Sequence, residues 1–338
     1  MQKTNRLLLA TFALLGASAA LAQSSVTIYG RVNTSVERQK VGGTSTTVMQ
    51  NNSSRFGFKG TEDLGGGLKA GFQLESGFNS DTGTGSGWTH PTTGMTFARQ
   101  SEVNLAGGFG MIRLGNFTPE SYYATADYVS MHNHDTGTSS DAFYYDPVWF
   151  GGLSGGLSTT NKIGYRSPSL GGLTVDASVS LHEKTSGGKN GYDLAANYNI
   201  GALNLGAGYS NLDSNYQLGL RALYTFGQFT VGGYYQRNKD ENQWTTTGAG
   251  TRNNFRLAGM YALGASEFHL NVGRAGKWSD VADSSATQWT LGYNYNFSKR
   301  TKVYAFYTKV DNKAGATYAT GVAGEDFSSV ALGVRHNF

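Results

Sequence analysis

Hydrophobic and polar positions alternate along most of the chain. In the segment TQWTLGYNYNF, residues 287–297, aromatic or aliphatic residues alternate with residues that are small or polar. The same period of two recurs at residues 68–75, 216–226 and 329–338. Successive side chains of a strand point to opposite faces, so the pattern predicts strands with one face in water and the other against an apolar medium.

The connections between the predicted strands alternate between short and long. Seven are tight turns, most of them containing glycine, and eight are polar loops, the longest of which covers residues 117–158. Fifteen connections join about sixteen strands, with about 20 residues for each strand and its connection, which is typical of outer-membrane barrels. The pattern predicts one all-β domain, a 16-stranded antiparallel transmembrane β-barrel.

A soluble β-sandwich also contains alternating strands. About sixteen long strands would require two or more sandwich domains, and the composition shows no boundary between domains. Aromatic residues also gather near predicted strand ends, as Tyr293, Tyr295 and Tyr304 do around the turn at 298–300. Aromatic girdles lie at both interfaces of a membrane barrel, so their presence favours the membrane interpretation.

The chain begins with the features of a secretory signal peptide at residues 1–22. Two basic residues precede an apolar run at residues 7–16, and Ala20-Leu21-Ala22 forms a small-x-small cleavage site. The apolar run is shorter than the roughly 20 residues that a spanning helix needs. We therefore expect export to the periplasm, removal of the signal peptide and a single barrel domain at residues 23–338.

Composition narrows the possible functions. The chain has 48 glycines, no cysteine and only 4 prolines, all of which fall between predicted strands. This distribution suits a sheet, because proline cannot donate a hydrogen bond to a strand ladder. Removal of the two basic residues of the signal peptide leaves 27 − 2 = 25 Lys and Arg against 23 Asp and Glu, a formal charge of +2. This small charge and the lack of basic runs argue against nucleic acid as a partner.

Several blocks of sequence resemble the general, trimeric outer-membrane porins of β-proteobacteria. The resemblance is carried by SSRFGFKGTEDLGGGLKAGFQLES at 53–76, FARQSEVNLAGGFGMIRLGN at 97–116, NKIGYRSPSLGGL at 161–173, LGYNYNFSKRTKVYAFY at 291–307 and the terminal GVRHNF. It implies a homotrimer of barrels in the outer membrane of a Gram-negative bacterium, with a long third loop folded into each pore. The size agrees with this, because sixteen strands leave an aqueous channel inside the barrel.

The resemblance also implies a constriction in which basic side chains of the wall face carboxylates. Arg55, Arg99 and Glu75 match the constriction residues of the family. Alternation places Arg55 and Glu75 toward the lumen, but it places Arg99 on the same face as Val103 and Leu105. Either a β-bulge changes the face of Arg99, or the outer face at this position packs in a trimer interface.

The chain departs from the family pattern at two positions near this constriction. Related porins often carry an arginine shortly before the NKIGY segment, where this chain has Ser158, and the usual LGR after the fifth strand is LGN here, with Asn116. Alternation places Lys162 and Arg166 toward the lumen, and we expect these two residues to replace the missing positive charge.

The long loop carries acids that could face the basic wall across the pore, namely Asp127, Asp135, Asp141 and Asp146. Opposed charges across a water-filled constriction orient polar solutes and exclude apolar ones. The wall charges assigned by alternation or resemblance are mostly basic: Arg31, Arg55, Lys59, Lys69, Arg99, Arg113, Lys162, Arg166 and Arg221, with Glu75 as the clearest acid. Basic rings favour anions in a pore, so we expect weak anion selectivity.

Phe338 is the last residue and ends a row of alternating apolar residues. This terminus resembles the signal that the outer-membrane assembly machinery reads in such porins. We therefore expect that machinery to be a partner of the C-terminal strand, in addition to outer-membrane lipid.

No motif predicts an enzyme or a cofactor. HNHD at 132–135 has no further metal ligands close to it, and GTGSG at 83–87 follows no strand of a nucleotide-binding fold. We expect passive diffusion of small hydrophilic solutes and ions through a water-filled channel. The main alternative is a solute-selective channel with a binding site in the constriction, whose current would saturate with solute concentration. A structural or adhesive barrel would not conduct.

Overall fold

The computed structural model describes residues 25–86, 96–126, 137–147, 160–183, 188–241 and 249–338. Most of these residues belong to one antiparallel sheet. Its strands are β1 (Ser25–Val41), β2 (Thr44–Asn51), β3 (Arg55–Gly65), β4 (Leu68–Phe78), β5 (Gly85–Ser86), β6 (Gln100–Gly107), β7 (Gly110–Asn116), β8 (Lys162–Arg166), β9 (Leu173–Ser180), β10 (Gly191–Ile200), β11 (Leu203–Leu212), β12 (Asn215–Phe226), β13 (Phe229–Asp240), β14 (Gly250–Leu263), β15 (Ser266–Ala275), β16 (Ala286–Asn296), β17 (Thr301–Asn312) and β18 (Phe327–Asn337).

The described part of the long loop between β7 and β8 contains two short helices with defined bounds. They are α2 (Glu120–Ala124) and the 3-10 helix η1 (Gly137–Ser139). Neither of these helices is long and apolar enough to cross a membrane, and the described residues contain no other candidate.

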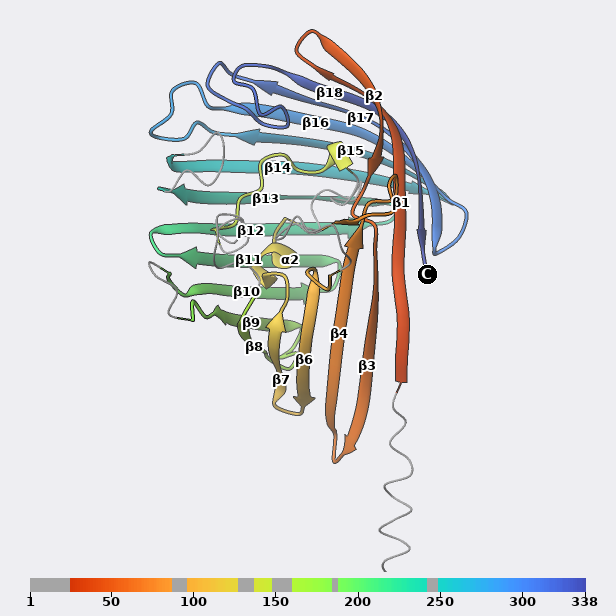
Figure 1. Cartoon of the computed structure of the whole chain (residues 1–338), viewed down its shortest axis with the longest axis vertical. Helices are drawn as coiled ribbons and strands as arrows, with labels where there is room; N and C mark the ends of the chain where they lie inside the picture. Colours follow the sequence, from red (N-terminus) through yellow and green to blue (C-terminus); the bar gives the residue numbers. More distant parts are fainter. Residues whose placement is uncertain (1–24, 87–95, 127–136, 148–159, 184–187, 242–248) are drawn as a thin grey trace, which may run out of the picture.

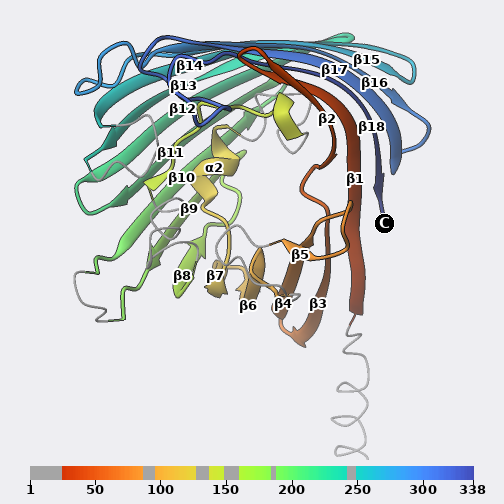
Figure 2. The same ribbon diagram turned by 45° about the horizontal axis from the view of Figure 1, so that its top comes forward.

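The sheet closes into a barrel, because β1 pairs with β18 at one edge and with β3 at the other. β2 pairs with residues 34–41 of β1 and continues into β3 after a break at residues 52–54, so β2 and β3 form one barrel strand. β5 is a two-residue extension beside β4. The eighteen strands of the sheet therefore make a barrel of 18 − 2 = 16 strands. The predicted 16-stranded antiparallel barrel is confirmed by this pairing, and Figures 1 and 2 show the curved wall of strands.

The alternation of the sequence corresponds to the two faces of the barrel. In β16, Gln288 and Thr290 point inward and are fully buried, whereas Leu291 is 56% exposed on the outer surface. In β18, Ser329 is buried inside and Leu332 is 66% exposed outside. The outer surface is therefore apolar and the inner surface polar, which is the inverse of a water-soluble barrel with an apolar interior.

Short glycine turns join neighbouring strands at one end of the barrel. Gly201, Gly227 and Gly264 follow β10, β12 and β14, and their φ angles are 58°, 55° and 59°. Two-residue hairpin turns require positive φ, which glycine adopts without steric cost. These turns fix the register of each hairpin and leave the long connections at the opposite end.

An aromatic band follows the outside of the barrel near these turns. Neighbouring rings contact one another from β12 to β16, with centroids 4.8–6.4 Å apart; they are Tyr224, Phe226, Phe229, Tyr261, Phe268 and Tyr293. Amphipathic rings are enriched where a barrel meets the interface between lipid and water. The band therefore indicates the level of one membrane interface.

Candidate functional site

The first described part of the long loop lies on the inner wall at β10 and β11, where α2 appears inside the ring (Figure 2). The Asp193 carboxylate of β10 accepts hydrogen bonds from the backbone N–H groups of Glu120 (2.8 Å) and Ser121 (3.1 Å). Gly206 of β11 permits the close approach, because a Cβ atom there would lie 1.8 Å from the carbonyl oxygen of Ala124. The helix therefore rests directly on the backbone of the sheet.

The second described part of the loop, at η1, contacts the wall near β1. The Thr138 hydroxyl donates to the Glu37 carboxylate (2.6 Å), which also accepts from the hydroxyls of Ser35 and Ser329 (2.9 Å each). Glu37 is fully buried. A buried carboxylate is stable only when hydrogen bonds replace its hydration, and here one of those hydrogen bonds comes from the loop.

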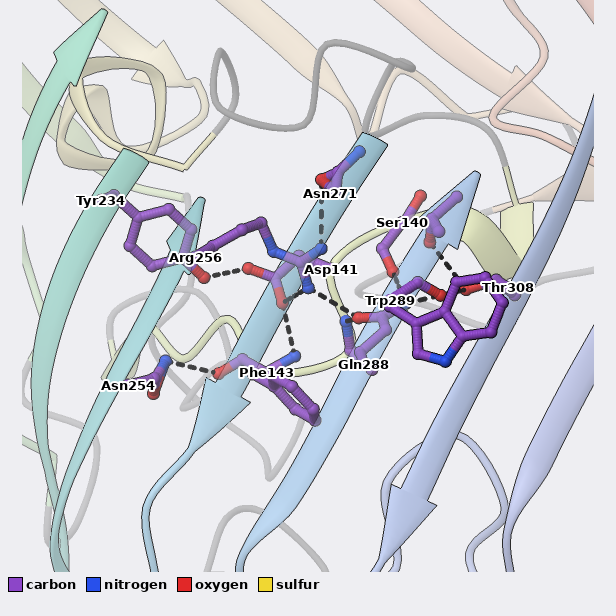
Figure 3. Close-up of polar contacts among 12 residues, drawn as sticks. Ser140, Asp141, Phe143, Tyr234, Asn254, Arg256, Asn271, Gln288, Trp289 and Thr308 are labelled. Carbon is purple, nitrogen blue, oxygen red and sulfur yellow. Dashed lines mark hydrogen bonds and ion pairs between the residues drawn. The ribbon is translucent and has the colours of Figure 1, made fainter. Parts of the chain in front are cut away.

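An ion pair holds the next residues of the loop against β14 (Figure 3). The Arg256 guanidinium is fully buried and donates to the Asp141 carboxylate (2.7 Å) and to the side-chain oxygen of Gln288 (2.6 Å). The Tyr234 hydroxyl donates to the other oxygen of Asp141. Gln288 in turn donates to the carbonyl oxygen of Ser140 (2.8 Å). The ion pair of Asp141 and the hydrogen bond to the backbone of Ser140 therefore hold the same short segment of the loop against the wall.

The following residues return along the wall toward β11. The Asp146 carboxylate accepts hydrogen bonds from the hydroxyls of Ser210 (2.9 Å) and Tyr144 (3.0 Å). Tyr145 donates its hydroxyl to the carbonyl oxygen of Lys239 (3.1 Å). Burial raises the pKa of both tyrosines, and the neighbouring Asp146 raises that of Tyr144 further. Both hydroxyls therefore stay protonated and act as donors.

A cluster of two arginines and one glutamate lies on the other side of the barrel. The Arg99 guanidinium is 2.7 Å from a Glu75 carboxylate oxygen, and that of Arg55 is 3.8 Å from the same oxygen. Counted from β1, with β2 and β3 as one strand, β4 is third and β13 eleventh, so the two are half a ring of sixteen apart. Arg55, Glu75 and Arg99, the Glu75 cluster, therefore lie across the barrel from Tyr145, which is hydrogen-bonded to Gln236 and Lys239 of β13.

Arg99 reaches Glu75 because it lies outside the strand. β6 begins at Gln100, and the Arg99 N–H donates to the backbone carbonyl of Glu75 (3.2 Å). Val103 is 54% exposed on the outer face, as alternation predicts for β6. The conflict over Arg99 is resolved by the strand boundary, and neither a bulge nor a trimer interface is needed to explain it.

Lys162 and Arg166 lie in a different cluster, at the start of the long loop. Lys162 is 2% exposed, and its ammonium group donates to the carbonyl oxygen of Phe117 (2.9 Å). Arg166 forms ion pairs with Glu120 (2.7 Å) and Asp176 (2.6 Å). These contacts hold the beginning of the loop, and they are separate from the contacts of the Glu75 cluster.

The described loop acids point into the wall. Asp141 is engaged by Arg256, Asp146 by hydroxyl groups, and Glu120 by Arg113 (Nη1–Oε1, 2.5 Å) and Arg166. Asp127, Asp135 and Ser158 lie outside the described residues, as do His132 and His134. Within the described part of the chain, no three His, Cys, Asp or Glu side chains gather as a metal site would require.

Several residues that hold the loop were not predicted from the sequence: Glu37, Asp193, Arg256 and Gln288. Arg256 carried a usable signal, because Arg252, Asn254 and Arg256 alternate in β14 and all point inward. The partners of these residues could not be inferred, since Asp141 and Arg256 are 115 residues apart.

Phe338 lies at the seam of the barrel. Its N–H and carbonyl group exchange two hydrogen bonds of 3.0 Å with the backbone of Gly30. A Cβ atom on Gly30 would lie 2.4 Å from the Phe338 ring, so the glycine leaves space for the terminal aromatic side chain. The last residue is therefore part of the closed sheet.

The comparisons with known proteins agree on one family. The family model described as Gram-negative porin matches residues 9–315. Outer membrane porin protein 32 of Delftia acidovorans is 32% identical over 98% of this chain and 99% of its own length. An outer membrane porin protein of Bordetella pertussis is 27% identical over the full length of both chains.

Solved structures share the fold. The anion-selective porin from Comamonas acidovorans superposes with a TM-score of 0.76 at 28% identity, over 94% of this chain and 100% of that one. OmpT of Vibrio cholerae, solved in a trimer form, has a TM-score of 0.66 at 18% identity, over 93% of this chain and 99% of that one.

Proposed function

Since the chain belongs to the Gram-negative porin family, we propose that its channel prefers small anions. The protein is an outer-membrane porin, a water-filled channel for passive diffusion and not an enzyme. Its ion preference depends on which charges face the lumen. The wall that binds the loop and the wall that carries the Glu75 cluster contribute different charges.

The proposal rests on which arginines bind the carboxylates of the loop and of the Glu75 cluster. Asp141 and Glu120 of the loop are held by Arg256, Arg113 and Arg166, so their charges are compensated in the wall. In the Glu75 cluster, two guanidinium groups share one carboxylate, which gives 2 − 1 = +1 for the three residues. Partly buried charges are screened less by salt than exposed ones, and arginine in a pore favours anions.

The residue roles follow from the same contacts. Arg55, Arg99 and Glu75 form the charged side of the constriction. Asp141 contributes by fixing the loop opposite them, and Lys162 and Arg166 contribute by holding its beginning. Asp127 and Asp135 remain candidates for the acidic side. The similarity to a porin whose own title calls it anion-selective supports the sign of the preference.

The assembly that we propose is a homotrimer in the outer membrane. OmpT, which shares this fold, has been solved as a trimer. We further propose that residues 1–22 are removed during export and that the assembly machinery reads the C-terminal strand ending at Phe338. The closure of the seam by this residue gives the machinery a physical reason to require it.

The test is the zero-current potential of the purified protein in a planar bilayer under a potassium chloride gradient. The double variant Arg55→Gln/Arg99→Gln should shift this potential toward cation preference and remove about half or more of the anion preference. Arg38→Gln/Arg237→Gln is the matched control, because both of these arginines lie on the outer face. An unchanged potential in the first variant would mean that the two arginines do not govern permeation.

A further inference from the structure

Two long connections at one end of the barrel pack against each other. They are residues 276–285, between β15 and β16, and residues 313–326, between β17 and β18. The short turns of such barrels face the periplasm, and the long connections lie on the extracellular side. The backbone N–H of Gly315 donates to the carbonyl oxygen of Asp283 (3.0 Å), and a Cβ atom on Gly315 would lie 2.1 Å from the carbonyl oxygen of Ala282. The two connections, the extracellular loop pair, are therefore in direct backbone contact.

The inner wall beside this loop pair is apolar, unlike the polar inner wall at Gln288 and Thr290. Four inward side chains at the extracellular ends of β15, β16, β17 and β18 are buried: Ala275, Ala286, Val310 and Phe327. Contact of such a patch with the water of the lumen would be unfavourable, so the patch requires an apolar cover. Phe143 of the long loop and Tyr318 of the loop pair cover it, and their rings meet edge to face with centroids 4.9 Å apart. One dry cluster therefore joins the long loop to the loop pair.

Arg252 of β14 binds the long loop and the loop pair at once. Its guanidinium group is buried and donates to the backbone carbonyl of Phe143 (2.5 Å) and to the Tyr318 hydroxyl oxygen (2.5 Å). Asn254, on the same inner face, donates to the same carbonyl (3.0 Å), as Figure 3 shows. Hydrogen bonds from a charged donor are stronger than neutral ones. The side chain that holds Phe143 most strongly therefore also holds the extracellular loop pair.

Trp278 adds a second link from the loop pair. Its indole ring is fully buried, with its centroid 4.5 Å from the guanidinium carbon of Arg252 and 5.7 Å from the ring of Tyr145 in the long loop. A cation over an aromatic face is attracted more strongly when water is excluded. The backbone N–H of Trp278 donates to the Ser284 hydroxyl (2.8 Å), which fixes the start of this connection. Both connections of the loop pair therefore contact Arg252 and the long loop.

We propose that Arg252, Trp278 and Tyr318 are positioning residues of the channel, which couple the long loop at Phe143 to the extracellular loop pair. Energetic coupling between separate regions is carried by packed side chains and hydrogen-bond networks that both regions share. Here the shared elements are one guanidinium group and one apolar patch. Displacement of the loop pair therefore changes the position of the long loop, and with it the conductance. The coupling rests on the channel function and not on the sign of the ion preference.

The first experiment removes contacts of the loop pair. Tyr318→Ala deletes a ring of the apolar cluster and a hydrogen-bond acceptor of Arg252. In planar bilayers, the fraction of time that single channels spend away from the main conductance level should rise about tenfold, the change in population expected from loss of one hydrogen bond to a charged group. Val322→Ala is the matched control, because Val322 belongs to the same connection but is 53% exposed, and it should behave as the native protein does.

The second experiment displaces the loop pair without removing any side chain. Gly315→Ala places a methyl group against the carbonyl oxygen of Ala282 and should force the two connections apart. Current fluctuations should increase, although the substitution lies between extracellular loops. Gly43→Ala is the control, because Gly43 lies in the turn between β1 and β2 at the same end of the barrel and a Cβ atom there meets nothing within 4 Å. In Gly315→Ala/Tyr318→Ala the two effects should not add, because both act on one coupled contact.

A conservative substitution of Trp278 separates its aromatic face from its indole N–H. That N–H has no hydrogen-bond partner among the residues that the structure describes. Trp278→Phe should therefore retain most of the native behaviour, whereas Trp278→Ala should fluctuate as Tyr318→Ala does. Thermal unfolding of each purified variant shows whether the barrel itself has formed.

The outcomes distinguish the coupling from the proposed anion preference. Native-like current in both Tyr318→Ala and Gly315→Ala would overturn the coupling. Additive effects in the double variant would also overturn it, because the loop pair would then act on the current without the long loop. If Arg55→Gln/Arg99→Gln leaves the reversal potential unchanged while the effects of Gly315→Ala and Tyr318→Ala are present and do not add, the anion preference fails and the coupling is supported.

Discussion

The two sides of the barrel use charge in different ways. On the side from β11 to β16, charged side chains that hold the loop are enclosed by polar partners: Arg256 forms an ion pair with Asp141, and Asp146 accepts hydrogen bonds from hydroxyl groups. On the side of β3, β4, β1 and β18, Arg31 lies opposite Arg55 and Lys302 opposite Arg335, and Arg55 and Arg99 share one carboxylate, that of Glu75. The first arrangement is rigid and sets the shape of the lumen. The second costs stability and leaves positive charge for solutes, so shape and selectivity can be altered separately.

The largest expected effect comes from breaking the pair between Asp141 and Arg256. Asp141→Asn leaves a buried guanidinium without its carboxylate, which costs about 3–5 kcal/mol for an unrelieved buried charge. We expect the loop segment to leave the wall, and single-channel conductance to become larger and noisier. The barrel itself should persist, because its strand pairing does not involve Asp141.

The control for this prediction is Asp141→Asn/Arg256→Gln, which removes both charges. Most of the native conductance should return in the double variant. Equal conductance in the native protein and in Asp141→Asn would show that the ion pair does not hold the loop.

A smaller effect is expected from Gly206→Ala in β11. The added methyl group would lie 1.8 Å from the carbonyl oxygen of Ala124, so α2 must move away from the sheet. Overpacking of this kind costs about 1–3 kcal/mol. Thermal unfolding and conductance should both change, whereas Gly259→Ala should alter neither, because a Cβ atom there meets nothing within 4 Å. Identical behaviour of the two variants would mean that α2 is not seated on Gly206.

The smallest expected effect concerns the ion preference set by the Glu75 cluster, on the opposite side of the barrel. Glu75→Gln removes the carboxylate that Arg55 and Arg99 share, so anion preference should increase modestly, opposite in sign to the effect of Arg55→Gln/Arg99→Gln. The zero-current potential in a salt gradient measures both. The increase should fade between about 0.1 and 1 M salt, as the screening length falls from roughly 10 to 3 Å. A shift toward cations would contradict the charge assignment.

The sequence predicted the barrel well, because strand faces follow from local alternation. The inward Thr290 and outward Leu291 of β16 need no information from other parts of the chain. The face on which the Arg99 side chain lies was harder to predict. It depends on the start of β6 one residue later, and strand boundaries depend on pairing partners.

The docking of the loop could not be predicted in detail. The acids of the long loop are alike in sequence, yet the structure pairs Asp141 with an arginine and Asp146 with hydroxyl groups. Which acid meets which partner depends on how the loop crosses the lumen, and that path is fixed by contacts such as the one between Gly206 and α2.

The seam between β1 and β18 has a consequence for how the protein reaches its folded state. Arg31 and Asn337, which are hydrogen-bonded across it, are 306 residues apart in the chain. Contacts of such long range form slowly, because a large loop must close first. Until Phe338 meets Gly30, β1 and β18 are open edges able to pair with another chain. The chain would therefore need protection from aggregation from its synthesis until the ring closes in the membrane.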